Sequence, residues 1–295
     1  MFVEERSRPV LFEVCRLLGL RASDAVLLRH HSNAVYGIDD VVVKIAPGEV
    51  AMGQVRSVVA LVRWLTRLGF PTVPLSPALA QPIRVAGHAV TVWERLDPAH
   101  DRPVTTAELG SLLHRLHSLP LPEIDLPDLR PLESIHRSLT LSEILDEDAR
   151  AFLFGRLESL GKSWSEMTFP RGNSLIQTDP QTRNALRRLD GTPVLADWDG
   201  AGVGPREWDI ATIAVHCRRF GLPGAASFAD FTDTYGWWDV ESWESFESLC
   251  RLRELQMIAT NARKCRPGTS AAAEVLRRVE GLQADAYDMT GWRIL

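Results

Sequence analysis

The hydrophobic pattern of the chain changes near residue 95, and this change restricts the fold more than any other feature. Before it, short runs of β-branched residues alternate with turns. After it, apolar residues recur every three or four positions over long stretches, which predicts helices, with one strand-like interruption at residues 175–195. We therefore expect an α+β chain with two parts: residues 1–94, rich in strands, and residues 95–295, mainly helical.

The pattern also gives approximate bounds for the elements. In the first part we expect helices at 7–18 and 50–68, and an antiparallel sheet from strands at 25–28, 35–38, 41–45, 83–85 and 89–93. In the second part we expect helices at 105–118, 142–161, 206–219, 243–263 and 271–286.

Composition excludes several classes of protein. The net charge of -5 argues against a general nucleic-acid binder, because binding to phosphate backbones requires a basic surface. No run of 18 apolar residues is present, so we expect no membrane span. The four cysteines form no CxxC pair, which indicates free thiols rather than a zinc site. The first residues are charged and unlike a signal peptide, so we expect a cytoplasmic protein.

One polar segment carries the clearest chemical signal. Asp179 and Asn184 lie five positions apart, and a strand-like stretch then ends at Asp197 and Asp199. Taken singly, such residues are usually turn formers. As an ordered set they supply what phosphoryl transfer needs, namely oxygen ligands for Mg²⁺ and a carboxylate that can orient a hydroxyl group. Burying several acids together would also be costly without a cation.

These residues resemble the motifs of the aminoglycoside phosphotransferase family, relatives of the protein kinases that phosphorylate small-molecule hydroxyls. The resemblance implies a bilobal protein-kinase-like fold: a small antiparallel β-sheet lobe with one long helix, which binds nucleotide, and a larger helical lobe. It implies that Asp179 is the catalytic base and that Asn184 and Asp197 are Mg²⁺ ligands. Asp199 is either a further Mg²⁺ contact or a turn former. Asp209, in Gly-Pro-Arg-Glu-Trp-Asp, would brace the catalytic loop.

The same resemblance assigns residues of the first lobe to ATP. Lys44, in Val-Val-Val-Lys-Ile, would contact the α/β-phosphates. Ser32 and Asn33 match the segment that covers the phosphates, although no Gly-x-Gly-x-x-Gly is present, so backbone amides and the Ser32 hydroxyl would substitute. The stretch from Trp93 to Leu96, which includes Glu94, would be the hinge whose backbone groups hydrogen-bond the adenine.

The chain departs from the family pattern at three points. Gln177 and Thr178 stand where the family has His and Gly before the catalytic Asp, and Gln177 would keep one supporting hydrogen bond. The long helix has no Glu to orient Lys44. Glu49, just before that helix, is either the partner of Lys44 or a charge that favours the helix dipole.

The resulting hypothesis is an ATP- and Mg²⁺-dependent phosphotransferase acting on a hydroxyl of a small molecule, such as an antibiotic, an aminosugar or a nucleoside-like metabolite. A cationic acceptor would suit the negative net charge, and either a monomer or a homodimer is compatible with the sequence. The alternative is a kinase-fold protein that binds nucleotide without catalysis. A protein kinase is disfavoured, because no Ala-Pro-Glu segment follows Asp197. The Trp237, Trp238 and Trp243 cluster is either part of an acceptor pocket or a packed helical corner.

Overall fold

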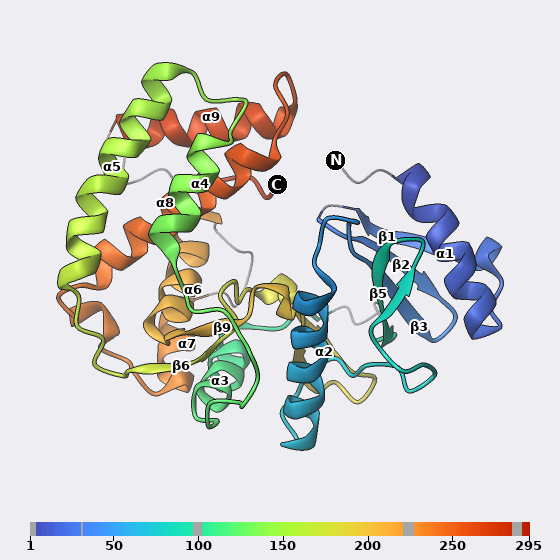
Figure 1. Cartoon of the computed structure of the whole chain (residues 1–295). Helices are drawn as coiled ribbons and strands as arrows, with labels where there is room; N and C mark the ends of the chain where they lie inside the picture. Colours follow the sequence, from blue (N-terminus) through green and yellow to red (C-terminus); the bar gives the residue numbers. More distant parts are fainter. Residues whose placement is uncertain (1–3, 31, 97–101, 221–226, 285–290) are drawn as a thin grey trace. The chain divides into compact units, whose positions relative to one another are not determined.

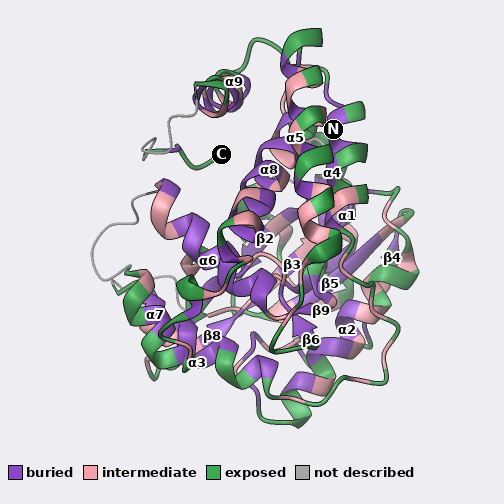
Figure 2. Cartoon of the chain, turned by 90° about the vertical axis from the view of Figure 1, so that its left-hand side faces the viewer, coloured by how far each residue is buried: buried purple, intermediate pink, exposed green. Residues whose placement is uncertain are grey.

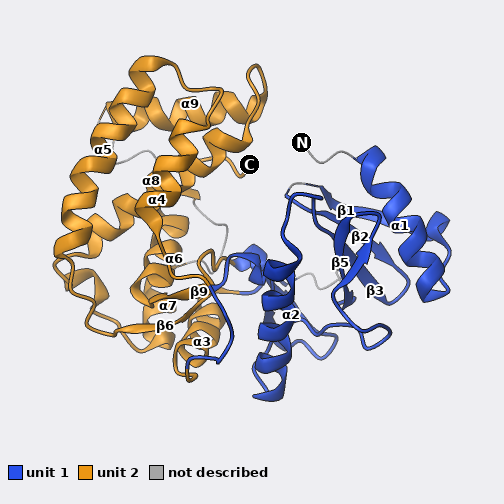
Figure 3. Ribbon diagram, in the orientation of Figure 1, with its two compact units in different colours: residues 1–104, 121–126, 182–201 blue, residues 105–120, 127–181, 202–295 orange. Residues whose placement is uncertain are grey.

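The computed structural model describes residues 4–30, 32–96, 102–220, 227–284 and 291–295. The chain divides into two compact units, shown in different colours in Figure 3. Unit 1 comprises residues 1–104, 121–126 and 182–201, and unit 2 comprises residues 105–120, 127–181 and 202–295. Residues 182–201 thus group with the β-rich unit, whereas the sequence analysis had assigned them to the helical lobe.

Unit 1 is built on a five-stranded antiparallel sheet with strand order β1-β2-β3-β5-β4 (Figure 1). The strands are β1 (Val26–His30), β2 (Ala34–Ile38), β3 (Val41–Ile45), β4 (Ile83–Val85) and β5 (His88–Glu94). All five were expected, with ends shifted by at most two residues. The expected antiparallel sheet is therefore confirmed.

The two faces of this sheet have different neighbours. Helix α1 (Glu4–Leu18) packs its apolar residues into one core with Val43 and Ile45 of β3. Side chains alternate along a strand, so Lys44 points to the opposite face. Helix α2 (Met52–Arg67) contacts β5 and the short helix η3 (Trp198–Gly200).

The rest of unit 1 includes the segment that carries Asp197. It contains η2 (Thr182–Asn184) and a hairpin of β7 (Ala185–Arg187) and β8 (Pro193–Leu195). Trp198 anchors the end of the hairpin: it is fully buried, lies edge-on to Phe70, and donates a hydrogen bond from Nε1 to Thr72 Oγ1 at 2.8 Å. This anchor fixes the backbone next to Asp197.

Unit 2 is mainly helical, and most of α8 is buried in it (Figure 2). Its helices are α3 (Thr106–His117), α4 (Pro131–Thr140), α5 (Glu147–Glu166), α6 (Glu207–Phe220), α7 (Phe228–Tyr235), α8 (Phe246–Lys264) and α9 (Ser270–Gln283). Helices α4, α5, α6 and α9 all contact α8. The sequence analysis missed α4 and α7. Within the described residues, no helix combines the length and apolarity needed to span a bilayer.

A two-stranded ribbon in unit 2 positions the polar loop that begins at Gln177. Strand β6 (Asn173–Ile176) pairs antiparallel with β9 (Gly202–Pro205), which was not expected. Gly204 is required at this place, because a Cβ atom there would lie 2.8 Å from Leu129 Cβ and 2.9 Å from Ile176 Cδ1. Close packing beneath the loop therefore explains the glycine that begins the Gly-Pro-Arg-Glu-Trp-Asp motif.

Candidate active site

Lys44 meets two carboxylates within unit 1. Its Nζ lies 2.7 Å from Asp199 Oδ2 and 3.5 Å from Asp197 Oδ1. Asn33 Nδ2 donates a hydrogen bond of 2.8 Å to the same Asp199 oxygen. Four residues that the sequence analysis named as candidates for the site therefore come together in one polar cluster.

Three members of the cluster, Asn33, Lys44 and Asp197, line a cavity of about 680 Å³ in unit 1. Ser32, Asn33, Asn184 and Asp197 lie in its wall, together with Lys44. The apolar part of the wall includes Leu28, Val35, Val42, Val73, Leu96 and Leu186. A cavity with an apolar wall and a few converging charged groups has the character of a small-ligand site, and the size suits a nucleotide.

The oxygen atoms in the cavity fit a magnesium ion. Mg²⁺ in phosphoryl-transfer sites takes one or two carboxylates and completes its coordination with phosphate and water oxygens. Asp197 and Asn184 supply a carboxylate and an amide oxygen, and Asp199 lies beside them. In the described part of the chain, no three His, Cys, Asp or Glu residues are grouped as a self-sufficient metal site. The donors present therefore suit a metal shared with a phosphorylated ligand.

Asp197 has an unusual backbone conformation. Its φ is 57°, in the left-handed region, which a short polar side chain such as Asp tolerates better than most. Asn184 is buried, and its carbonyl accepts a hydrogen bond of 2.8 Å from the amide of Ala196, which precedes Asp197. This bond ties the segments of the two predicted metal ligands to each other.

The hinge residues Glu94 and Leu96 also line the cavity. The amide of Glu94 donates to Pro74 O at 3.0 Å, and that of Arg95 donates to Asp40 O at 2.8 Å. Both N–H groups are thus engaged within the protein, which leaves Leu96 to supply any hinge amide to an adenine. The hinge role of this stretch stays a prediction.

The structure does not support the interpretation of Glu49 as the partner of Lys44. It is exposed in the turn before α2, and among the described residues the acids that contact Lys44 are Asp197 and Asp199. The first turn of α2 contains no acid. The partner of Lys44 is therefore supplied by the segment after β8, not by the helix or the turn before it.

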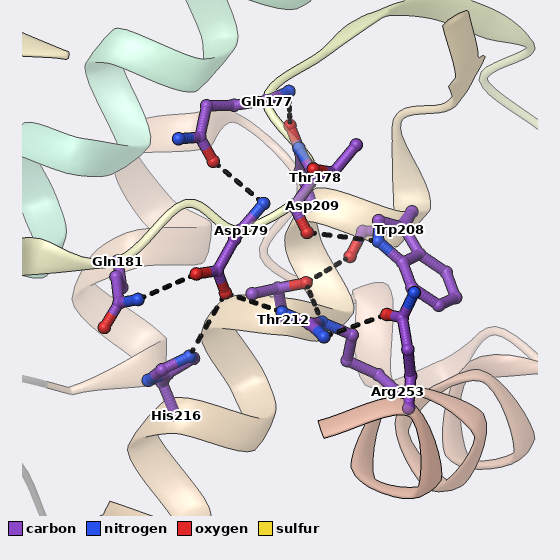
Figure 4. Close-up of polar contacts among 10 residues, drawn as sticks. Gln177, Thr178, Asp179, Gln181, Trp208, Asp209, Thr212, His216 and Arg253 are labelled. Carbon is purple, nitrogen blue, oxygen red and sulfur yellow. Dashed lines mark hydrogen bonds and ion pairs between the residues drawn. The ribbon is translucent and has the colours of Figure 1, made fainter. Parts of the chain in front are cut away.

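In unit 2, Asp209 holds the loop that carries Asp179 (Figure 4). Asp209 is fully buried near the start of α6 and accepts hydrogen bonds of 2.8 Å from the amides of Gln177 and Thr178. Its Oδ2 also lies 3.1 Å from Nε2 of the buried His117 on α3. A buried carboxylate is stable only when its oxygens are hydrogen-bonded, and these contacts provide that.

Two of the three departures from the family pattern, Gln177 and Thr178, have structural counterparts. The Gln177 side chain accepts a hydrogen bond of 2.8 Å from the Asp179 amide through Oε1, and this bond supports the loop. Thr178 has a φ of 72°, a left-handed conformation that glycine adopts freely and a β-branched residue rarely does. Hydrogen bonds hold it there: its amide donates to Asp209, and its carbonyl accepts from Trp208 Nε1 at 3.2 Å.

Two residues beside Asp179 were missed by the sequence analysis. Arg253 on α8 is buried and donates from Nη2 to Asp179 Oδ1 at 2.6 Å. Arg253 also donates to Thr212 Oγ1 at 2.7 Å (Figure 4) and to Gln256 Oε1 at 2.9 Å. His216 on α6 is buried, with Nε2 3.9 Å from the same Asp179 oxygen.

These neighbours determine the ionisation of Asp179. Burial by itself would raise the pKa of the carboxyl, but His216 and the charge of Arg253 outweigh it and lower the pKa to about 2. Gln181 Nε2 adds a hydrogen bond of 2.9 Å to the other oxygen, Oδ2. Asp179 is therefore held as a carboxylate by fixed donors at neutral pH.

The aromatic cluster near residue 240 is largely packed. Trp237 and Trp243 have ring centroids 6.3 Å apart, and the Arg171 guanidinium lies 4.6 Å from the Trp237 ring centroid. Trp243 also contacts Phe169. Only Trp238 of the three tryptophans is largely exposed. These contacts match the interpretation as a packed helical corner.

Comparisons with known proteins agree with this description. The profile of the phosphotransferase enzyme family, APH, matches residues 15–246. No curated protein sequence matches the chain significantly.

Several solved structures share the fold. An amicoumacin kinase, hAmiN, in complex with AMP-PNP, Ca²⁺ and Ami, has a TM-score of 0.75 at 16% identity, covering 99% of this chain and 98% of that one. A microcompartment-associated aminopropanol kinase has a TM-score of 0.68 at 16% identity, with 91% and 94% covered. A choline/ethanolamine kinase family protein from Mesorhizobium loti has 0.65 at 15% identity, with 97% of both covered. The chain thus has the expected kinase-like fold, belongs to the APH phosphotransferase enzyme family and is a small-molecule phosphotransferase.

Proposed function

We propose that this phosphotransferase moves the γ-phosphate of ATP to a hydroxyl group of a small molecule, with Mg²⁺. The observation that carries the proposal is the cavity cluster, in which Lys44 lies within 3.5 Å of both Asp197 and Asp199. A lysine beside oxygen donors for a cation is the arrangement that a triphosphate–metal complex requires. ATP as donor also agrees with a cytoplasmic location, which belongs to the same proposal.

The cavity residues would bind the donor. Lys44 would bond the α/β-phosphate oxygens, and Ser32 and Asn33 would cover the phosphates from the turn before β2. Glu94 and Leu96 would receive the adenine. Asn184 and Asp197, with Asp199 as a further contact, would hold Mg²⁺, which when bound neutralises charge on the phosphates. Glu49 has no part in this proposal.

Asp179 would act on the acceptor. Its carboxylate accepts a hydrogen bond from the acceptor hydroxyl and so orients the oxygen toward the γ-phosphorus. The new O–P bond forms as the bond from the γ-phosphorus to the bridging oxygen breaks, ADP leaves, and the hydroxyl proton passes to Asp179. With a pKa of about 2, Asp179 is a weak base, so orientation is its larger contribution. Gln177 and Asp209 keep its loop in place.

The acceptor is proposed at the level of class. The solved structures with the same fold include kinases named for amicoumacin, aminopropanol and choline or ethanolamine, which supports a hydroxylated small molecule. Antibiotics, aminosugars and nucleoside-like metabolites are the classes to test. An antibiotic acceptor would make the protein a resistance enzyme.

The test is an ADP-release assay with ATP and Mg²⁺ over a panel of these acceptors, repeated with GTP and with EDTA. We expect acceptor-dependent ADP release that EDTA abolishes and that Asp179→Asn removes while ATP binding persists. ATP binding without release for any acceptor would favour a nucleotide-binding protein without catalysis. Absence of nucleotide binding in the wild type would overturn the proposal.

A further inference from the structure

An irregularity in β1 brings Arg29 to the cavity, beside Lys44. The strand pairs with β2 as Leu27 opposite Tyr36 and then Arg29 opposite Val35, so Leu28 is an extra residue. This is a β-bulge, a feature that re-aims side chains and occurs next to active sites. Without it, Leu28 would stand opposite Val35, and Arg29 would point to the other face of the sheet.

The bulge places Arg29 in a row with the phosphate lysine. Residues directly opposite each other in a sheet point to the same face. Arg29 is opposite Val35, and Val35 is opposite Lys44, so the two cations flank one valine on the same face. All three residues line the same cavity.

The two cations also share a carboxylate. Arg29 Nη1 lies 3.7 Å from Asp197 Oδ2, and Lys44 Nζ lies 3.5 Å from the other oxygen, Oδ1. The Arg29 side chain is 52% exposed, whereas that of Lys44 is 18% exposed. An exposed pair at this distance adds little to folding stability. Stability therefore does not explain why the strand is distorted to direct an arginine here.

A phosphate-binding role does explain it. The segment over the phosphates lacks the glycine-rich sequence whose backbone amides would face them. Phosphoryl transfer develops charge on several phosphate oxygens, and the planar fork of arginine binds such oxygens in pairs. We propose that Arg29 is a second phosphate-binding residue, which leaves Asp197 and bonds the β/γ-phosphate oxygens when the nucleotide enters. This inference rests on the proposed function of the cavity.

The experiment compares nucleotide binding by calorimetry, with ATP and AMP, for the wild type, Arg29→Gln, Arg29→Lys and Arg84→Gln. Arg84 is the control, because it is exposed on β4, the opposite edge strand, and does not line the cavity. We expect Arg29→Gln to weaken ATP binding roughly tenfold, as for loss of a charge-assisted hydrogen bond, and AMP binding much less. Arg29→Lys should fall between, and Arg84→Gln should match the wild type.

Other results would overturn the inference. If Arg29→Gln binds ATP as tightly as the wild type, the arginine is a surface residue only. If the Arg29→Gln variant binds ATP more tightly, then Arg29 in the wild type hinders nucleotide binding through its contact with Asp197 and does not bind phosphate. Equal losses for ATP and AMP would indicate a general change in the cavity. In each of these cases the proposed function still stands if the wild type binds ATP and turns over. If the wild type binds no nucleotide, the proposed function and the inference about Arg29 both fail.

Discussion

Asp197 in unit 1 and Asp179 in unit 2 each lie beside a cation, but the two cations are held differently. Lys44 reaches Asp197 at 3.5 Å from a cavity wall, and in the described part of the chain its partly exposed side chain is paired with Asp197 and Asp199. Arg253 is 7% exposed, contacts Asp179 at 2.6 Å, and bonds two further side chains. The first pair can exchange partners with an incoming ligand. The second pair is a fixed support.

The contrast follows from the chemistry of the two side chains. Lysine is a point charge on a rotatable stem, which suits a contact that must break when phosphate binds. When it is buried, as in Arg253, the arginine fork can satisfy a carboxylate, a hydroxyl and an amide at once, which suits a contact that must persist. We therefore expect substitutions at Lys44 to change ligand binding, and substitutions at Arg253 to change stability and the state of Asp179.

The largest effect is expected at Asp179. Asp179→Asn should lower kcat by roughly 10²–10⁴-fold, the usual contribution of a positioned acid–base group, with little change in the Kd for ATP. The measurements are steady-state kinetics and calorimetry. Asp233→Asn, at an exposed position of α7, is the control. A variant that keeps wild-type kcat would show that Asp179 is not the acceptor-binding carboxylate.

The next effect is expected at Lys44. Lys44→Met should raise the KM for ATP by about tenfold, because one charged contact to phosphate is lost. The melting temperature should change little, since the lysine contacts acids at a cavity wall. Lys162→Met, on an exposed face of α5, should leave both quantities unchanged. If Lys44→Met instead lowers the melting temperature strongly and leaves the KM for ATP unaltered, the distinction between the Lys44–Asp197 and Arg253–Asp179 pairs is wrong.

Arg253 should behave in the opposite way. Arg253→Met leaves Thr212 and Gln256 without their donor, which costs about 1–3 kcal/mol of unfolding free energy, while the KM for ATP stays near that of the wild type. Since the charge of Arg253 lowers the pKa of Asp179, its loss raises that pKa, and the acid limb of kcat/KM moves to higher pH. His216 and Gln181 also contact Asp179, so the pKa should not return fully to its ordinary value.

The pH profile distinguishes an effect of Arg253 on the ionisation of Asp179 from an effect on packing alone. Arg253→Lys keeps the charge, so its acid limb should remain close to that of the wild type even if its stability falls. An Arg253→Met enzyme with an unshifted acid limb would mean that the arginine supports only the fold.

The smallest effect is expected at Thr178. Thr178→Gly removes the cost of a left-handed conformation, which is about 1–2 kcal/mol for a residue with a Cβ atom and is offset in part by the backbone entropy of glycine. We expect the melting temperature to rise by about 2 °C, with kcat within about twofold of the wild type. Thr178→Ala is the matched control, because alanine keeps the Cβ atom and should give no such gain. Equal melting temperatures for the two variants would argue that the loop is unstrained.

Motif spacing was enough to find the residues on short, continuous segments. Asp179, Asn184 and Asp197 lie within nineteen residues of one another, and hairpin β7–β8 accounts for the interval between the last two. The strands of unit 1 were predictable because their alternation is local. The same reasoning missed α4, where Pro131 occupies the first helical position.

Residues brought together from distant helices gave no such signal. Arg253 is 74 positions from Asp179, and a single arginine on a helix is most often a solvated residue. The partner of Lys44 gave no local signal either: the sequence left Glu49 open as one possibility, whereas Asp197 and Asp199, more than 150 positions away, contact the lysine. Ion pairs over such separations depend on tertiary packing.

The sequence by itself determined the fold class, the family and the order of the acids from Asp179 to Asp209, because strand alternation, helical periodicity and motif spacing are properties of continuous chain. Only the tertiary structure decided which cations each acid meets: Lys44 and Arg29 for Asp197, and the buried Arg253 for Asp179. It also decided that the bulge at Leu28 turns Arg29 toward the cavity, because one inserted residue reverses the face of every side chain that follows it.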